Sequence, residues 1–261
     1  MRTRSLYIKH ILPDYHQFML LHEDRNAAGS KLISASATLA EKLLNLPDYI
    51  FNEDPRPTLS PPYPTVKQYR ENHAWRQEPF YEYICDFANA WKHRRISRDG
   101  RKISNISDVQ EIVGICRYVD EAGEYYRSRK YIFAKLVDGN LIDMREMLTK
   151  SLEFWGRELF SINILDSIPF SPSYKDPHIE RLNPLYKKPL ILHAINGEND
   201  FSPTVQAFRF DYQTGILQPA QDKNFNGEAN LEILVHRSPL SKRKKTILKR
   251  LYVTVSANSK R

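Results

Sequence analysis

The sequence predicts an α+β protein, with an N-terminal helical domain that carries a short β-hairpin and a small antiparallel β-rich domain after it. Two observations support this class. Apolar residues recur at helical spacing in three segments before residue 161, whereas after residue 190 they come in short β-branched runs separated by glycines. We therefore expect a helical domain over residues 1–167, a proline-rich connector over 168–189 and a β-rich domain over 190–261.

The first predicted helix covers residues 32–51, where five leucines fall at helical spacing. Ser30 could cap its N-terminus, and Pro47 should end or kink it. Residues 54–64 contain five prolines, which exclude a regular element there. That stretch is an extended connector or an ordered loop, and a proline-rich ligand for an aromatic groove is the less favoured alternative.

A second helix is predicted from residue 78 to about residue 93. Its apolar face, which we expect in a core, is formed by Phe80, Ile84, Phe87 and Trp91. A polar stripe runs along the opposite side and consists of Glu82, Asp86, Asn89 and His93. The simplest interpretation of this stripe is the solvated side of an amphipathic helix.

Strands are expected next, at residues 109–119 and 130–137, because both runs are rich in β-branched and aromatic residues. Asp138-Gly139 is typical of a tight turn, so residues 141–144 should form the returning strand of a hairpin. Helical spacing resumes over residues 144–160.

The C-terminal part begins after residues 168–189, which contain five prolines. Short strand-like runs follow at residues 190–195, 205–212, 231–235 and 250–255. Their lengths are typical of a small antiparallel sheet.

The overall charge is +8, from 39 Lys and Arg against 31 Asp and Glu, and it favours contact with a polyanion. Nucleic acid, anionic lipid and an acidic protein all fit. Only two cysteines are present, Cys85 and Cys116, which makes a disulfide framework or a cysteine zinc site improbable and fits a reducing cytosol. Residues 1–12 lack the apolar core of a signal peptide and no segment is apolar enough to span a membrane, so a soluble, cytoplasmic protein is expected.

Two basic clusters are candidate phosphate-binding sites. The first comprises Lys92, Arg94, Arg95, Arg98, Arg101 and Lys102. The second comprises Lys242, Arg243, Lys244, Lys245, Lys249 and Arg250. Such clusters can grip a nucleic-acid backbone, although basic residues between strands also serve to discourage edge pairing.

The polar stripe could also support catalysis, with Asp86 or Glu82 orienting His93 as a general base, Asn89 beside it, and the neighbouring basic residues holding a phosphate. Asp86 and His93 are two helical turns, about 10 Å, apart, so a direct contact would need a mediator. The alternative is that Asn89 and His93 simply end the helix, where a histidine suits the negative end of the dipole. No metal-binding spacing, P-loop or dinucleotide motif occurs, and neither a metal nor a cofactor is expected.

The segment DFANAWKH resembles a diffuse group of uncharacterised bacterial proteins in which a helix carries an Asp-x-x-Asn-x-x-Lys-His pattern. Asp86, Asn89, Lys92 and His93 match that pattern, and the order of elements matches over about residues 32–160. The resemblance implies a mostly helical unit with a small β element in a bacterial or phage setting, and no particular activity.

A weaker resemblance is to the HEPN-type helical ribonucleases, whose signature is an Arg and a His four to six residues apart. Only Arg4 and His10 match that spacing strictly, at the N-terminus and not late in the domain. The resemblance would imply metal-independent RNA cleavage, in which the histidine moves a proton and the arginine steadies the phosphate.

Taken together, the sequence predicts a bacterial cytoplasmic protein that binds RNA or DNA backbone through its basic clusters. A non-catalytic module for an acidic protein partner is the alternative, and a metal-independent ribonuclease is a remote one.

Overall fold

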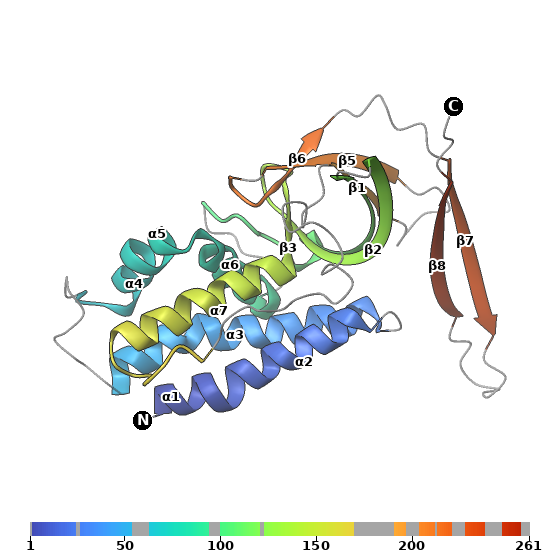
Figure 1. The fold of residues 1–261 in the computed structure, drawn as a ribbon. Helices are drawn as coiled ribbons and strands as arrows, with labels where there is room; N and C mark the ends of the chain where they lie inside the picture. Colours follow the sequence, from blue (N-terminus) through green and yellow to red (C-terminus); the bar gives the residue numbers. More distant parts are fainter. Residues whose placement is uncertain are drawn as a thin grey trace. The chain divides into compact units, whose positions relative to one another are not determined.

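The structure is a computed structural model that describes residues 2–24, 27–53, 63–93, 100–120, 123–169, 191–196, 204–211, 213–220, 228–237 and 247–256. The α+β class is confirmed, with helices dominating the N-terminal part and strands the C-terminal part (Figure 1). Contacts divide the chain into two units. We call them the helical unit (Met1–Glu111, Tyr131–Arg181, Asp211–Gln218) and the β unit (Ile112–Lys130, Leu182–Phe210, Pro219–Arg261). The units interleave along the chain, which differs from the three consecutive segments expected.

The helical unit opens with three helical segments that the sequence did not predict, α1 (Arg2–Leu6), the π-helix η1 (Tyr7–Ile11) and α2 (Leu12–Glu23). Pro13 is the second residue of α2, which follows the π-helix η1 directly, and the backbone is helical on both sides of the proline. One side is buried and carries Tyr7, Ile11, Tyr15 and Phe18, at intervals of three or four residues.

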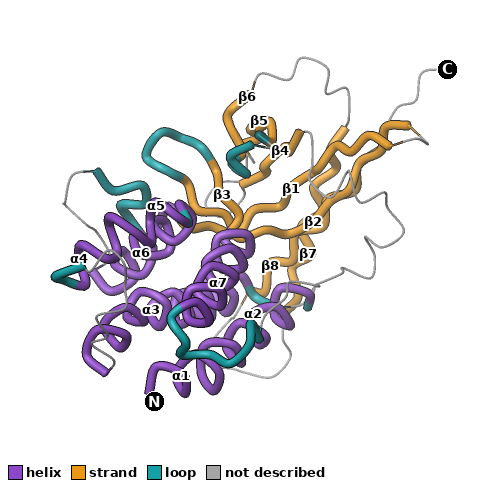
Figure 2. The backbone as a smooth tube through the Cα atoms, turned by 60° about the vertical axis from the view of Figure 1, so that its left-hand side comes forward, coloured by secondary structure: helices purple, strands orange, loops and turns teal. Residues whose placement is uncertain are grey.

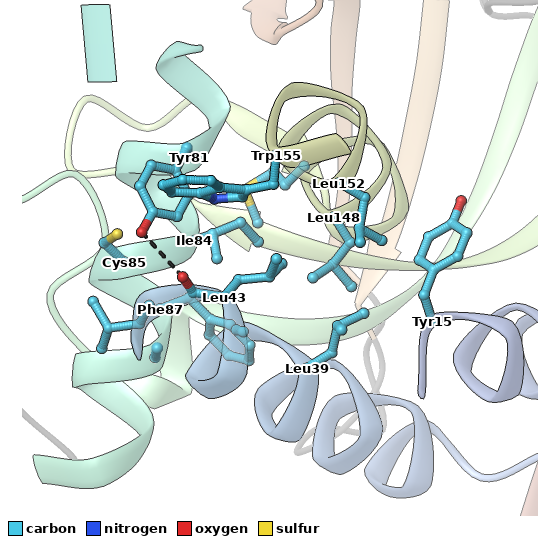
Figure 3. Packing of buried hydrophobic residues seen from close by; sticks show 14 of the residues in the cluster. Tyr15, Leu39, Leu43, Tyr81, Ile84, Cys85, Phe87, Leu148, Leu152 and Trp155 are labelled. Atoms are coloured by element: carbon cyan, nitrogen blue, oxygen red, sulfur yellow. Dashed lines mark hydrogen bonds between the residues drawn. The ribbon is translucent and has the colours of Figure 1, made fainter. Parts of the chain in front are cut away.

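Helix α3 (Gly29–Glu53) passes straight through Pro47, so the prediction that the proline could end the helix was wrong, as was the placing of Ser30 outside the helix as its cap. Pro47 has no N–H to give to the carbonyl of Leu43. The hydroxyl of Tyr81 donates to that carbonyl instead, at 3.0 Å (Figure 3). Arg70 Nη2 donates to the next carbonyl, that of Leu44, at 3.1 Å. A partner from another helix therefore satisfies the carbonyl that the proline leaves free.

Four segments follow the first proline-rich stretch, whose residues 54–62 lie outside the described part. They are α4 (Val66–Tyr69), the π-helix η2 (Arg70–Ala74), α5 (Trp75–Gln77) and α6 (Pro79–His93). Helix α6 confirms the second predicted helix, and it packs against α3 and α7 (Figure 2).

The burial of α6 departs from its predicted faces at two positions. Ile84 and Phe87 are buried as expected, but Trp91 is 37 % exposed, so its assignment to the core was wrong. Asp86 is only 1 % exposed, so the polar stripe is not simply a solvated face.

The predicted hairpin is confirmed. Strand β2 (Gly123–Lys135) pairs antiparallel with β3 (Leu141–Asp143), with Phe133 opposite Asp143. Gly139 in the turn has φ +85°, which glycine adopts without strain. Strand β6 (Leu217–Ala220), which the sequence did not predict, pairs with β3 at Leu217.

Helix α7 (Met144–Ser161) confirms the third predicted helix and starts at Asp143, whose carboxylate accepts from Arg145 N at 2.9 Å. Its buried face meets the other helices. Tyr7 OH donates to Leu152 O at 2.9 Å, and the rings of Tyr81 and Trp155 lie edge to face at 5.1 Å (Figure 3). These contacts place α7 in the centre of the apolar core.

The β unit contains an antiparallel ladder and a hairpin. In the ladder, β1 (Val109–Asp120) pairs with β4 (Ile191–Asn196), and β4 pairs with β5 (Thr204–Phe210). The hairpin joins β7 (Glu228–Arg237) to β8 (Ile247–Ser256) in antiparallel register. The four C-terminal strands that the sequence predicted are thus confirmed, whereas residues 170–189 of the expected connector lie outside the described residues.

Candidate functional site

The carboxylate of Asp86 anchors the segment that follows α6. One of its oxygens accepts from the guanidinium of Arg101, and the other accepts from the backbone N–H of Lys102 at 2.7 Å. Charge-assisted hydrogen bonds of this kind are the strongest available to a buried carboxylate. Asp86 and Arg101, predicted for separate roles, are therefore partners in a buried ion pair.

Lys102 is held by its backbone on two sides. Its N–H is bound by Asp86, and its carbonyl accepts from Val137 N at 3.0 Å. The next residue, Ile103, is fully buried. The backbone of Lys102 is therefore fixed, while its side chain is exposed.

The last three residues of α6, Trp91, Lys92 and His93, are all exposed. Asn89 Nδ2 donates to the carbonyl of Cys85 within the same helix, at 2.8 Å. Because both oxygens of Asp86 bond to residues 101 and 102, the structure does not assemble Asp86, Asn89 and His93 into one hydrogen-bonded array. It brings Asp86, Arg101 and Lys102 together instead.

Glu82 lies one turn before Asp86 and is half-buried. Burial raises its pKa, and the negative charge of Asp86 adds to the effect, while Lys102 and Arg101 oppose it. The charges of Asp86, Arg101 and Lys102 therefore all act on Glu82. These four residues come from the predicted polar stripe and from the first basic cluster.

The side-chain geometry of the other predicted basic residues is not described. Arg94, Arg95, Arg98, Lys242, Arg243, Lys244 and Lys245 lie outside the described residues. Lys249 and Arg250 lie in β8, opposite Val235 and Leu234 of β7, and only their backbone is described.

The pair that matched the HEPN-type spacing is not arranged as a site of its own. Arg4 forms an ion pair with Asp166, at 2.6 Å. His10 is exposed and lies in the π-helix η1. In the HEPN-type chemistry Arg4 would hold the phosphate, and here its guanidinium is paired with the carboxylate of Asp166.

Sequence reasoning missed a second polar cluster, in which Glu158 of α7 meets two residues from α4 and η2. Its Oε1 accepts from Tyr69 OH at 2.7 Å and lies 2.9 Å from His73 Nε2. The Tyr69 and His73 rings are stacked, with centroids 5.2 Å apart. Burial acts to raise the pKa of Glu158, but the hydrogen bonds from His73 and Tyr69 outweigh it and lower the pKa.

This cluster has the components of a proton-transfer pair, because a carboxylate that holds one histidine nitrogen orients the ring. Aromatic rings enclose it, with Tyr63 at 5.8 Å and Phe154 at 6.3 Å from the His73 ring. The spacing of Tyr69 and His73 at i and i+4 is visible in the sequence. Their pairing with a glutamate 85 residues further along has no local signal.

One other reactive group, a cysteine thiol, is placed by the fold. Cys85 is buried, and burial raises its pKa to about 12, which keeps the thiol protonated and unreactive.

Among the residues that the structure describes, no group of three or more His, Cys, Asp or Glu side chains is arranged to hold a metal ion. In the same residues, no helix combines the length and apolar character needed to cross a bilayer.

Comparison with known proteins gave no match to a family model, to a curated protein or to a solved structure.

Proposed function

We propose that this chain binds the phosphate backbone of RNA or DNA through cations displayed at the end of α6 and in the segment that Asp86 anchors. The observation that carries the proposal is the fixed backbone and exposed side chain of Lys102, with exposed Lys92 on the last turn of α6. Because the backbone of Lys102 is already fixed, only its side chain has to be ordered when it meets a phosphate. Arg101 serves a different purpose, because its charge is used by Asp86.

The surrounding sequence supports the same function. Arg94, Arg95 and Arg98 follow Lys92 directly, and the whole chain carries a net charge of +8. A basic surface attracts nucleic acid over distances of about a Debye length, roughly 10 Å at moderate salt. We further propose that the protein works in the reducing cytoplasm of a bacterium, as its two cysteines and the Asp86-to-His93 pattern indicate.

A salt series with labelled single-stranded RNA and duplex DNA tests the proposal. The double variant Lys92→Ala/Lys102→Ala should bind more weakly. The slope of log affinity against log salt should fall by about 0.7 to 0.9 for each phosphate that the variant no longer neutralises. The matched control is Lys9→Ala/Lys31→Ala, which removes two exposed lysines from other segments and changes the net charge equally.

Equal weakening by both double variants would mean that net charge alone drives binding and would overturn the assignment to this site. Absence of binding by the wild-type chain at low salt would reject nucleic acid and direct the search to an acidic protein partner. Strand cleavage that depends on His93 but not on a metal would add an activity to the binding function.

A further inference from the structure

Trp91 is the most exposed of the four apolar residues on its helix face, of which Phe80 is partly buried. Ile84 and Phe87 are fully buried, yet the side chain of Trp91 is 37 % exposed. It lies on the last turn of α6, two residues before the helix ends at His93. A large aromatic side chain left partly in water at the end of a helix forgoes the full gain of burial, which makes it a candidate for contact with a ligand.

The geometry of the helix end explains the exposure. Successive residues are about 100° apart around the axis, so Trp91, Lys92 and His93 together cover about 200° of it. All three are exposed, whereas Ala90 is buried. The last turn therefore projects beyond the core.

The orientation of the indole follows from the helix itself. Side chains on an α-helix lean towards its N-terminus, so the Trp91 ring lies towards the turn that contains Phe87. The residue as a whole is 37 % exposed, so part of it is accessible to a ligand. An accessible indole can stack on another planar ring.

We propose that the exposed part of Trp91 stacks on an unpaired base of single-stranded nucleic acid while the neighbouring Lys92 contacts a phosphate of the same strand. This inference rests on the proposed function and narrows its ligand to single strands. Stacking of bases on aromatic side chains beside a cationic surface is the chemistry by which proteins bind single strands without reading sequence. In a duplex the base faces are occupied by their neighbours, so duplex binding would use the cations alone.

The test compares two probes, an oligouridylate of about 15 nucleotides and an RNA duplex of similar total charge, each titrated into the full-length chain at one salt concentration. The variants are Trp91→Ala, Trp91→Tyr and the control Tyr49→Ala. Tyr49 is a suitable control because it is an aromatic residue of the same unit with a similar exposed fraction, 39 % against 37 %. Thermal unfolding of each variant verifies that it is folded.

We expect Trp91→Ala to lose about 10-fold in affinity for the oligouridylate, in line with the usual contribution of one stacked base. Its duplex affinity should be unchanged, Trp91→Tyr should retain most of the single-strand affinity, and Tyr49→Ala should bind both probes like the wild type. Intrinsic fluorescence gives a second readout on the unmodified chain. Of its three tryptophans, Trp155 is fully buried and Trp75 is half-buried, so quenching by the single strand should come chiefly from Trp91.

Three results would overturn the inference while leaving the proposed function intact. In the first, the wild type binds both probes and Trp91→Ala keeps its single-strand affinity. In the second, Trp91→Ala loses affinity equally for the single strand and the duplex. In the third, saturating oligouridylate does not quench the fluorescence of the wild-type chain. Failure of the wild-type chain to bind either probe at low salt would instead reject the proposed function itself. The fluorescence readout needs no variant, so it holds even if Trp91→Ala does not fold.

Discussion

Two carboxylates of the helical unit, Asp86 and Glu158, are each held by two donors, but their donors differ in kind. Asp86 accepts from a guanidinium and a backbone N–H, and it is only 1 % exposed. Glu158 accepts from a tyrosine hydroxyl and meets a histidine, and its side chain is 13 % exposed. Arginine stays charged at any pH at which the protein is folded, whereas histidine is charged only when protonated.

The difference in hydrogen-bond donors indicates a different role for each cluster. The buried pair of Asp86 and Arg101 is a structural tie, because the carboxylate holds the segment that follows α6 through both of its oxygens. The cluster around Glu158 can exchange protons, and its histidine is part of a π-helix, a local form that occurs frequently at functional sites. The first cluster fixes the backbone of Lys102, and the second is where a change in pH should act on the fold.

Breaking the first cluster should have the largest effect. Asp86→Ala leaves the largely buried Arg101 without a counter-charge, and loss of one member of a buried pair costs about 3–5 kcal/mol of unfolding free energy. Urea unfolding measures the loss. The exposed pair of Arg4 and Asp166 is the control, because Asp166→Ala should cost no more than about 0.5 kcal/mol. Equal losses in the two variants would show that Asp86 is not a structural tie.

A smaller loss is expected at the second cluster. Glu158→Gln keeps an oxygen that can accept from Tyr69 but removes the charge that meets His73, so we expect a cost of about 1–2 kcal/mol at neutral pH. The same urea measurement applies. No loss in Glu158→Gln would mean that the hydrogen bond from Tyr69 alone holds the cluster.

The stability difference between wild type and Glu158→Gln should depend on pH, and this dependence tests the comparison of the two clusters further. The pKa of Glu158 is lowered in the folded chain, so the unfolded chain binds its proton more readily. Its contribution to stability is therefore fully present above the usual carboxyl value of 4.5 and is lost as the pH falls through the lower folded pKa. Wild type and Glu158→Gln should thus converge in stability as the pH falls below 4.5, and a gap that does not shrink down to the lowest pH at which both chains fold would contradict the assignment.

The contribution of a third carboxylate, Glu78, to stability should change with pH in the opposite direction to that of Glu158, and this effect should be the smallest. Glu78 is buried and accepts one hydrogen bond, from Phe80 N at 3.2 Å. Burial raises its pKa, which the hydrogen bond, Lys150 and Arg157 only partly oppose. The ionised form therefore costs stability. The cost is fully present above the raised folded pKa, shrinks as the pH falls through it, and is gone below the usual carboxyl value of 4.5.

Glu78→Gln retains the acceptor and removes the charge. We expect this variant to gain on the order of 0.5 kcal/mol at neutral pH and to match the wild type in acid. Thermal unfolding across a pH series would show it. A loss of stability at neutral pH would indicate that Lys150 and Arg157 dominate the environment of Glu78.

The sequence by itself determined the features that depend on neighbouring residues. Apolar spacing located the helices that became α3, α6 and α7, and Asp138-Gly139 marked the turn of the β2–β3 hairpin, because helix periodicity and turn chemistry are set within a few residues. The basic run after α6 was also visible, although only tertiary structure separates Arg101, which is used internally, from Lys102, which is displayed.

Only the tertiary structure decided the features that need a distant partner. Helix α3 continues through Pro47 because Tyr81, 38 residues away from Leu43, satisfies the carbonyl of that leucine. Asp86 is buried because Arg101, 15 residues further along the chain, neutralises it. Glu158 meets His73 because the fold brings α7 against η2. The exposure of Trp91 depends on where the core ends and not on the spacing of its helix. A buried polar group needs a partner, and local periodicity carries no information about which distant residue will provide it.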